Sequence, residues 1–156
     1  MTEAVQENKQ VIFNIDKIYV KDLSLEIPHA PKVYFGRDNP QIDIQLANQA
    51  SSVEEGLFEV VVMVTVTAKI GEKVMFLIEV KQAGMFQVRN VPEHELEHIL
   101  AVMCPNILFP YLREVVSDVA VRGGFAPALL NPINFDAIYQ QRKQQQAQAA
   151  SPMTTH

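Results

Sequence analysis

The stretch "EVVVMVTVTAKIGEKVMFLIEVKQAGMF", residues 59–86, decides the fold of this chain. Its β-branched residues alternate, and one side of an extended chain would carry Val60, Val62, Val64 and Val66. Such a two-residue period is typical of a strand, because successive side chains point to opposite faces of a sheet. The tripeptide "GEK" at 71–73 interrupts the run and is typical of a hairpin turn. We therefore predict two long antiparallel strands, over 57–70 and 74–86, joined by a tight turn.

Two further segments have the same period. Residues 11–27, "VIFNIDKIYVKDLSLEI", alternate but change phase, which predicts a bulge or twist between Asp16 and Lys21. Residues 41–48, "QIDIQLAN", predict a shorter strand. Its apolar face carries Ile42, Ile44 and Leu46. Together these segments make four predicted strands.

After Pro92 the period becomes helical. The apolar residues recur at i, i+3, i+4 and i+7, as Leu96, Ile99, Leu100 and Met103. Pro105 and Pro110 predict a break or kink, and Gly123-Gly124 predict the end of this helix. A last helix should begin at a cap formed by Asn134 or Asp136.

Strands followed by helices predict an α+β fold, with a four-stranded antiparallel sheet and both helices packed on one face. We expect a flexible N-terminus over 1–10, a single domain over 11–141 and a disordered tail over 142–156. The opposite sheet face is unusual for a solvated surface. It mixes carboxylates with Val61, Met63 and Leu77, which suggests a surface that binds another protein.

Composition excludes several classes of protein. The chain has 156 residues and a formal net charge of −5, which argues against binding to nucleic acid or anionic membranes. It has no run of about 18 apolar residues, so we expect no direct membrane insertion. The polar start "MTEAVQENKQ" and the single Cys104, which we expect to be buried and inert, indicate a cytoplasmic protein.

Residues 94–98, "HELEH", match the H-E-x-x-H motif of zinc metalloproteases. The helical period places His94 and His98 opposite the apolar stripe of Leu96, where they would face water instead of a buried cleft. We therefore predict a solvated helix face and no metal site. A zinc hydrolase using His94, Glu95 and His98 remains an alternative.

Residues 106–121, "NILFPYLREVVSDVAV", are more apolar than one buried stripe requires. This predicts a helix with two apolar sides, one for its own sheet and one for another subunit, although a thick core would give the same pattern.

Several long blocks resemble the SecB family of bacterial export chaperones. They are "IYVKDLSLEIPHAP", the stretch quoted first, "CPNILFPYLREVVSDVAVRGGF" and "LNPINFDAIY", in this order within residues 11–141. The resemblance implies a homotetramer, a dimer of dimers, with no catalytic activity, cofactor or metal. It also implies a chaperone that holds unfolded secretory precursors and delivers them to the ATPase SecA. A chaperone of the same fold that serves a toxin–antitoxin pair is an alternative.

The resemblance also implies site residues. The SecA-docking positions fall on Asp22, Glu26, Leu77 and Glu79. The tetramer contact falls on Phe76, Ile78 and Val80, on the side of that strand that faces the helices. The candidates for binding clients are aromatic and aliphatic: Tyr34, Phe35, Ile42, Ile44, Leu46, Phe125, Leu129, Leu130, Phe135 and Ile138. The turn "RDNP" lacks the tryptophan of some relatives.

Overall fold

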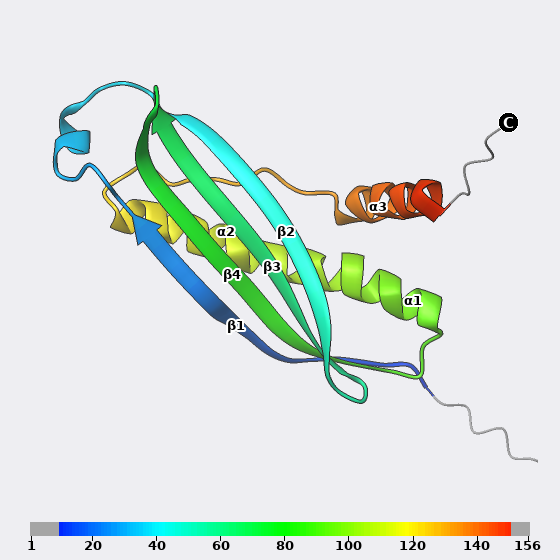
Figure 1. The fold of residues 1–156 in the computed structure, drawn as a ribbon. Coiled ribbons are helices and arrows are strands. Elements are labelled where there is room, and N and C mark those ends of the chain that lie inside the picture. Colours follow the sequence, from blue (N-terminus) through cyan, green and yellow to red (C-terminus); the bar gives the residue numbers. More distant parts are fainter. Residues whose placement is uncertain (1–9, 151–156) are drawn as a thin grey trace, which may run out of the picture.

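The chain folds into one antiparallel sheet with a layer of helices on a single face (Figure 1). The computed structural model describes residues 10–150. The strands are β1 (Ile12–Glu26), β2 (Gln41–Glu54), β3 (Leu57–Ile70) and β4 (Lys73–Arg89), in the spatial order β1-β4-β3-β2. The predicted α+β class and the four-stranded antiparallel sheet are confirmed.

The central hairpin forms as predicted. Ile70 pairs with Lys73, so the turn consists of Gly71 and Glu72. Gly71 has a φ of 61°, a left-handed conformation that favours glycine in a two-residue hairpin. The valines of even number on β3 are all buried, with exposures of 0–2% for Val60, Val62, Val64 and Val66.

Strand β1 contains the predicted irregularity, and it occurs twice. The register with β4 shifts between Ile15 and Lys17 and again between Val20 and Asp22. Each extra residue reverses the alternation that follows it. As a result, Ile15, Ile18 and Leu23 all lie on the helix side of the sheet, because their partners on β4 do.

Of the break or kink predicted at the prolines, the break does not occur. The chain is helical without interruption from α1 (Glu93–His98) through the π-helical segment η2 (Ile99–Met103) to α2 (Cys104–Arg122). In η2 the backbone hydrogen bonds reach one residue further, and Cys104 N–H donates to the carbonyl of Ile99. Pro105 has no N–H to donate to the carbonyl of Ala101. The side-chain amide of Asn48 donates to that carbonyl instead, at 3.5 Å.

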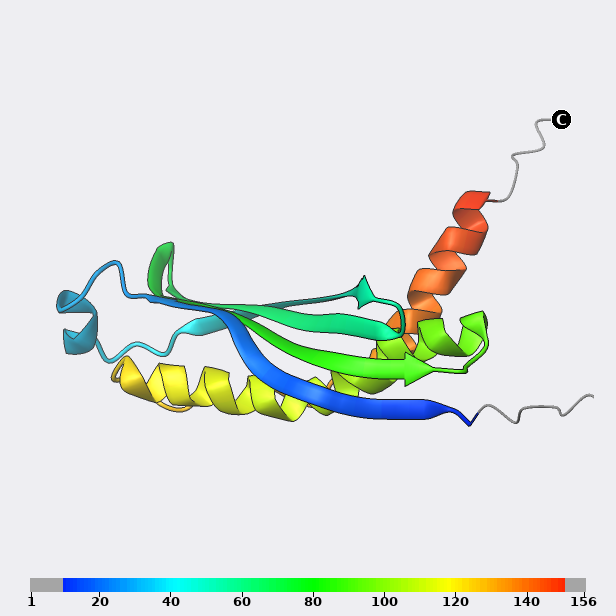
Figure 2. The same cartoon turned by 90° about the horizontal axis from the view of Figure 1, so that it is seen from below.

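Helix α2 lies over β4 and β3 and builds the core there, while the opposite face of the sheet stays open (Figure 2). Leu108, Leu112 and Val116 are fully buried against the valines of β3. By length and apolar composition alone, the helical run Glu93–Arg122 could cross a membrane. Its packing against the sheet accounts for part of that composition, since 39% of the apolar window is buried.

The even-numbered side chains of β4 belong to the same core. Phe76, Ile78 and Val80 are 4%, 0% and 1% exposed, and they pack within their own subunit. They do face the helices, as predicted. Within one subunit little of their surface remains exposed, and their predicted contact with another subunit stays a prediction.

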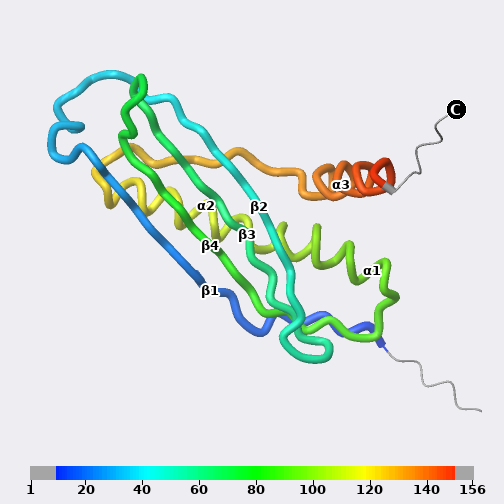
Figure 3. Tube along the Cα trace, viewed as in Figure 1, coloured from blue at the N-terminus to red at the C-terminus, as the bar shows by residue number. Residues whose placement is uncertain are grey.

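From the end of α2, residues 123–134 return along the helix layer to α3 (Phe135–Ala150) (Figure 3). Asn134 caps this helix, since its Oδ1 accepts a hydrogen bond of 3.0 Å from Ala137 N–H. The helix continues well past residue 141, so the predicted disordered tail begins too early. The expected flexible residues 1–9 and the final residues 151–156 lie outside the described part of the chain.

Candidate functional site

The open face of the sheet brings the four predicted docking residues together. Opposite residues of paired strands share a face. Glu26 pairs with Leu77, and Ser24, between Asp22 and Glu26 on this face, pairs with Glu79. All three carboxylates are exposed, and Leu77 is half-buried among them. The bulge after Val20 is what places Asp22 and Glu26 on this face while Leu23 and Leu25 turn toward the helices.

The charges on the open face are divided between its two ends. The end near the β3–β4 turn carries most of the carboxylates and continues onto β2, where Asp43 pairs with Thr67, the neighbour of Leu77, and lies beside Lys69 of β3. The other end carries lysines, with Lys81 opposite Asp22 and Lys17 opposite Met85. A basic segment of a partner would therefore be attracted to one half of the face.

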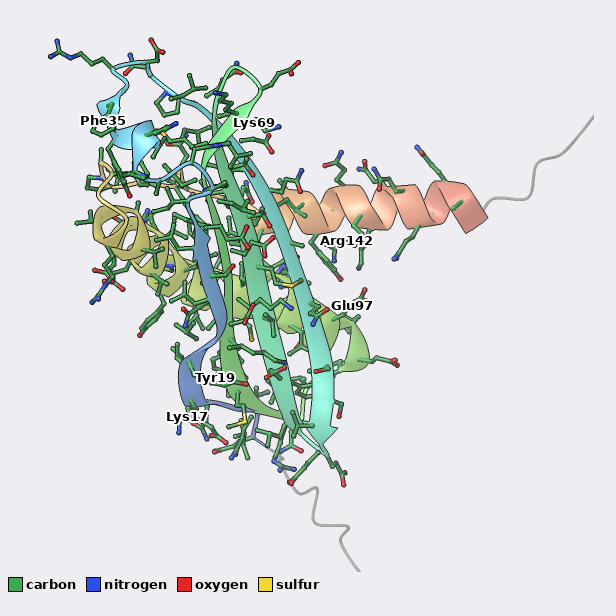
Figure 4. The ribbon with its side chains drawn as sticks, turned by 60° about the vertical axis from the view of Figure 1, so that its left-hand side comes forward. Lys17, Tyr19, Phe35, Lys69, Glu97 and Arg142 are labelled. Carbon is green, nitrogen blue, oxygen red and sulfur yellow. The ribbon has the colours of Figure 1, made fainter. Side chains whose placement is uncertain are left out.

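A cluster of three polar side chains lies toward the lysine-bearing end of the open face. Tyr19 Oη–H and the ammonium of Lys21, at 2.6 Å, both donate to the carboxylate of Glu59. The pKa of Glu59 is lowered, first by its hydrogen bond from Lys21 and then by that from Tyr19. Burial, with the neighbouring carboxylate, raises the pKa of Tyr19 to about 12. The sequence did not predict this cluster, because its members come from β1 and β3, which are distant in sequence. Figure 4 labels Tyr19.

An apolar groove of about 480 Å³ opens on the helix side of the sheet. Its lining joins the β2 edge to the returning segment after α2. Five predicted client residues line it: Ile42, Ile44, Phe125, Leu129 and Leu130. Leu129 is 76% exposed at the rim, whereas Leu130 is 5% exposed. Phe125 is held from two sides, by Phe76 at 4.6 Å and Tyr34 at 5.4 Å between ring centroids.

The other client candidates lie elsewhere. Phe135 is 2% exposed and packs edge-on against Phe109, so it belongs to the core instead of the groove. Tyr34 braces Phe125 and donates a hydrogen bond of 2.7 Å to the carbonyl of Gly123. Three more candidates do not line the groove: Leu46, Ile138 and Phe35. Figure 4 labels Phe35.

Sequence reasoning missed part of the groove lining. Val66 of β3 and Met75 and Phe76 of β4 also contribute to it. The alternation of side chains predicts that Val66 and Phe76 lie on the helix side of the sheet. It does not show whether a helix or an open groove lies above each of them.

The four predicted docking residues and the groove lie on opposite faces of the sheet. Strand β2 shows this within three consecutive residues: Ile42 and Ile44 line the groove, and Asp43 between them points to the open face. A ligand in the groove and a partner on the open face would therefore not compete for the same surface.

The histidines of "HELEH" have different surroundings. His94 is exposed, as predicted. His98 is not simply solvated, because its Nε2 lies 3.4 Å from Asp136 Oδ1 and its ring lies edge-on to Tyr139 at 5.6 Å. Within residues 10–150, no group of three or more His, Cys, Asp or Glu side chains is placed to hold a metal ion.

Cys104 is buried as predicted. Burial raises the pKa of its thiol to about 12, so the nucleophilic thiolate is disfavoured at neutral pH.

Comparison with known proteins agrees with this geometry. A family model described as "Preprotein translocase subunit SecB" matches residues 6–146. "Protein-export protein SecB" of Methylobacillus flagellatus is 56% identical over 154 residues, 99% of this chain and 98% of the relative. The protein of the same name from Nitrosospira multiformis is 55% identical, over 95% of this chain and 93% of its own length.

A solved structure also has this fold. It is a SecB-like chaperone of Mycobacterium tuberculosis, in complex with a peptide from an antitoxin. The TM-score is 0.64 at 20% identity, and the match covers 78% of this chain and 90% of the other. The family match over most of the chain and the near full-length relatives agree with one another, and the chain belongs to the SecB family.

Proposed function

We propose that this chain is a cytoplasmic protein-export chaperone, which holds unfolded secretory precursors in its grooves and delivers them to SecA. The SecB family consists of chaperones, and its members named above are export proteins. The observation that carries the proposal is the separation of two surfaces. An apolar groove lies on one side of the sheet and an acidic face on the other.

The groove fits extended, non-native polypeptide. Folded proteins bury their large apolar side chains, so only an unfolded segment offers them to a groove. Burying one Leu, Val or Phe side chain of the client contributes about 1.5–3 kcal/mol. Such a lining recognises apolar surface and not one particular sequence, so the range of clients is broad. Nothing in this binding requires nucleotide.

The acidic face fits a basic segment of SecA. Asp22, Glu26 and Glu79 supply charge, and Leu77 supplies a small apolar centre between them. Contacts of this kind accelerate association and weaken as salt increases. Because the groove is on the opposite side, the chaperone can hold a client while it docks.

The proposed assembly is a homotetramer. The outer edge of β1 has no partner strand within the described chain, and a second copy could pair there to join two sheets. Apolar side chains are exposed beside this edge, including Val20 at 43% and Leu23 at 47%. Helix α2 also exposes Tyr111 and Val121, at 51% each, on the side away from its own sheet. Unlike Phe76, Ile78 and Val80, these surfaces are exposed in one subunit, and we propose them as further contacts between subunits.

Two variants test the proposal reciprocally. The triple change Asp22→Lys, Glu26→Lys, Glu79→Lys should reduce affinity for SecA at least tenfold, equivalent to about 1.4 kcal/mol, and leave binding of an unfolded precursor unchanged. The change Ile44→Asp with Leu129→Asp should do the reverse, because it places charge in an apolar groove. Each variant is titrated with both ligands by calorimetry, after light scattering has shown unchanged assembly.

If the wild-type protein binds an unfolded precursor but not SecA, export delivery is wrong and a chaperone of another system, such as a toxin–antitoxin pair, becomes the better assignment. If the triple variant loses both ligands together, the two surfaces are not independent.

A further inference from the structure

The bulge in β1 places a lysine beside the acidic docking face. Lys21 is the extra residue between the pairs Val20–Gln82 and Asp22–Lys81. Its side chain lies on the open face, because its ammonium contacts Glu59, which shares that face. The bulge that places Asp22 on the open face therefore also places the preceding residue, the cationic Lys21, on the same face.

That cation is directed away from Asp22. The Lys21 ammonium lies 2.6 Å from Glu59 Oε1, two strands away across β4. The Glu59 side chain is only 17% exposed, whereas that of Lys21 is 44% exposed. Tyr19 donates to the second oxygen of the same carboxylate. Glu59 is thus oriented by two donors and fixed in a strand near the centre of the sheet.

A half-buried carboxylate at this position needs an explanation. It costs desolvation on a face that is otherwise open to water, and an exposed ion pair contributes little stability by itself. The row beside it, which contains Tyr19, Ala83 and Val61, is already closed, with Ala83 and Val61 at 0% and 1% exposure. Packing alone would be served by an apolar residue in place of Glu59.

We propose that Glu59 is a positioning residue that sets the specificity of the docking face, by holding the Lys21 ammonium away from Asp22, Glu26 and Glu79. This inference rests on the proposed docking of a basic partner. Without Glu59, the flexible Lys21 side chain would turn toward its neighbour Asp22 and, with Lys81 opposite, would offset the negative potential that attracts the partner. The partner is therefore a lysine- or arginine-rich segment, which an ammonium near Asp22 would repel.

The test is a set of variants titrated at low ionic strength with SecA and, separately, with an oligolysine peptide. Glu59→Gln keeps the shape of the side chain but releases Lys21, and it should weaken both affinities about threefold or more. Adding Lys21→Met to Glu59→Gln should restore the wild-type affinity. Tyr19→Phe is the matched control, because it removes a hydrogen bond to Glu59 without freeing Lys21, and it should bind like the wild type.

A second control separates positioning from net charge. Asp43→Asn removes one negative charge from the same face but releases no cation, so it should weaken binding less than Glu59→Gln does. If Asp43→Asn has an equal or larger effect, or if Lys21→Met fails to rescue Glu59→Gln, the inference is wrong.

The position of Lys21 can be observed without a partner. The ¹⁵N-labelled ammonium of Lys21 should give a slowly exchanging signal in the wild type that disappears in Glu59→Gln. A freely exchanging ammonium in the wild type would overturn the inference. If SecA does not bind the wild-type protein, the proposed export role fails, while the oligolysine series and the ammonium signal still decide the role of Glu59.

Discussion

Leu77 and Ile78 are neighbours in sequence and lie on opposite faces of β4. Leu77 is half-buried on the open face opposite Glu26. Ile78 is completely buried between the sheet and the helix layer. The alternation of side chains along a strand therefore separates a proposed docking residue from a core residue at the next position.

This difference predicts unequal costs of truncation. Ile78→Ala should lower the free energy of unfolding by about 2–4 kcal/mol, because it leaves a cavity in the core. Leu77→Ala should cost about 1 kcal/mol or less, since little buried volume is lost. Urea unfolding of both variants at one fixed protein concentration measures the difference. Equal costs would show that Ile78 is not enclosed within its own subunit.

At the scale of elements, a contact joins α1 and α3, the first and last helices, at one end of the helix layer. His98 of α1 reaches Asp136 in the first turn of α3, and the same imidazole lies against Tyr139. Tyr139 is 6% exposed, so this part of α3 is anchored, whereas the side chains from Gln140 to Ala149 are exposed. The remainder of the helix extends beyond β2, as Figures 1 and 2 show.

We predict that His98→Ala loosens α3 and that His94→Ala does not. The loss removes a partly exposed contact with Asp136 and a ring contact with Tyr139, so the cost in stability should be about 1 kcal/mol or less. Amide hydrogen exchange in the first turns of α3 should become several-fold faster in His98→Ala. His94→Ala is the matched control on the same helix. Equal exchange in the two variants would mean that His98, like His94, is only a solvated side chain.

At the scale of the whole molecule, the outward side of α2 is the feature that a single subunit leaves unexplained. Tyr111 and Val121 are each 51% exposed on a helix whose other side forms the core. Burial of this side against a second copy would remove apolar surface from water, which is the main favourable term in association.

We predict that Tyr111→Glu or Val121→Glu shifts the assembly toward smaller species, because a charge at an apolar contact must be desolvated or must separate the partners. Asn106→Glu, at an exposed polar position of the same helix, should leave the assembly unchanged. Light scattering over a range of protein concentrations measures the mass of each variant. A full wild-type mass for both apolar-site variants at low concentration would exclude this side of α2 as the contact between subunits.

Much of the fold followed from local periodicity. Alternation predicted the strands, "GEK" predicted the hairpin turn, and the phase change in residues 11–27 predicted the irregular β1. The grouping of Asp22, Glu26, Leu77 and Glu79 was expected from the family resemblance, and strand parity agreed with it. These features are readable because the side-chain period of a strand assigns a face to each residue without knowledge of its neighbours in space.

Other features required the tertiary structure, because they depend on what covers each face. Parity placed Phe76, Ile78 and Val80 toward the helices, but only the packing of α2 shows that their own subunit buries them completely. Pro105 is accommodated within a continuous helix because of η2 and an amide from a distant strand, and no local rule predicts either. The contacts of His98 with α3 and of Lys21 with Glu59 join residues 38 or more positions apart. By itself the sequence determined which residues share a face; the three-dimensional packing decided which faces are closed, since burial is a property of surfaces brought together from distant parts of the chain.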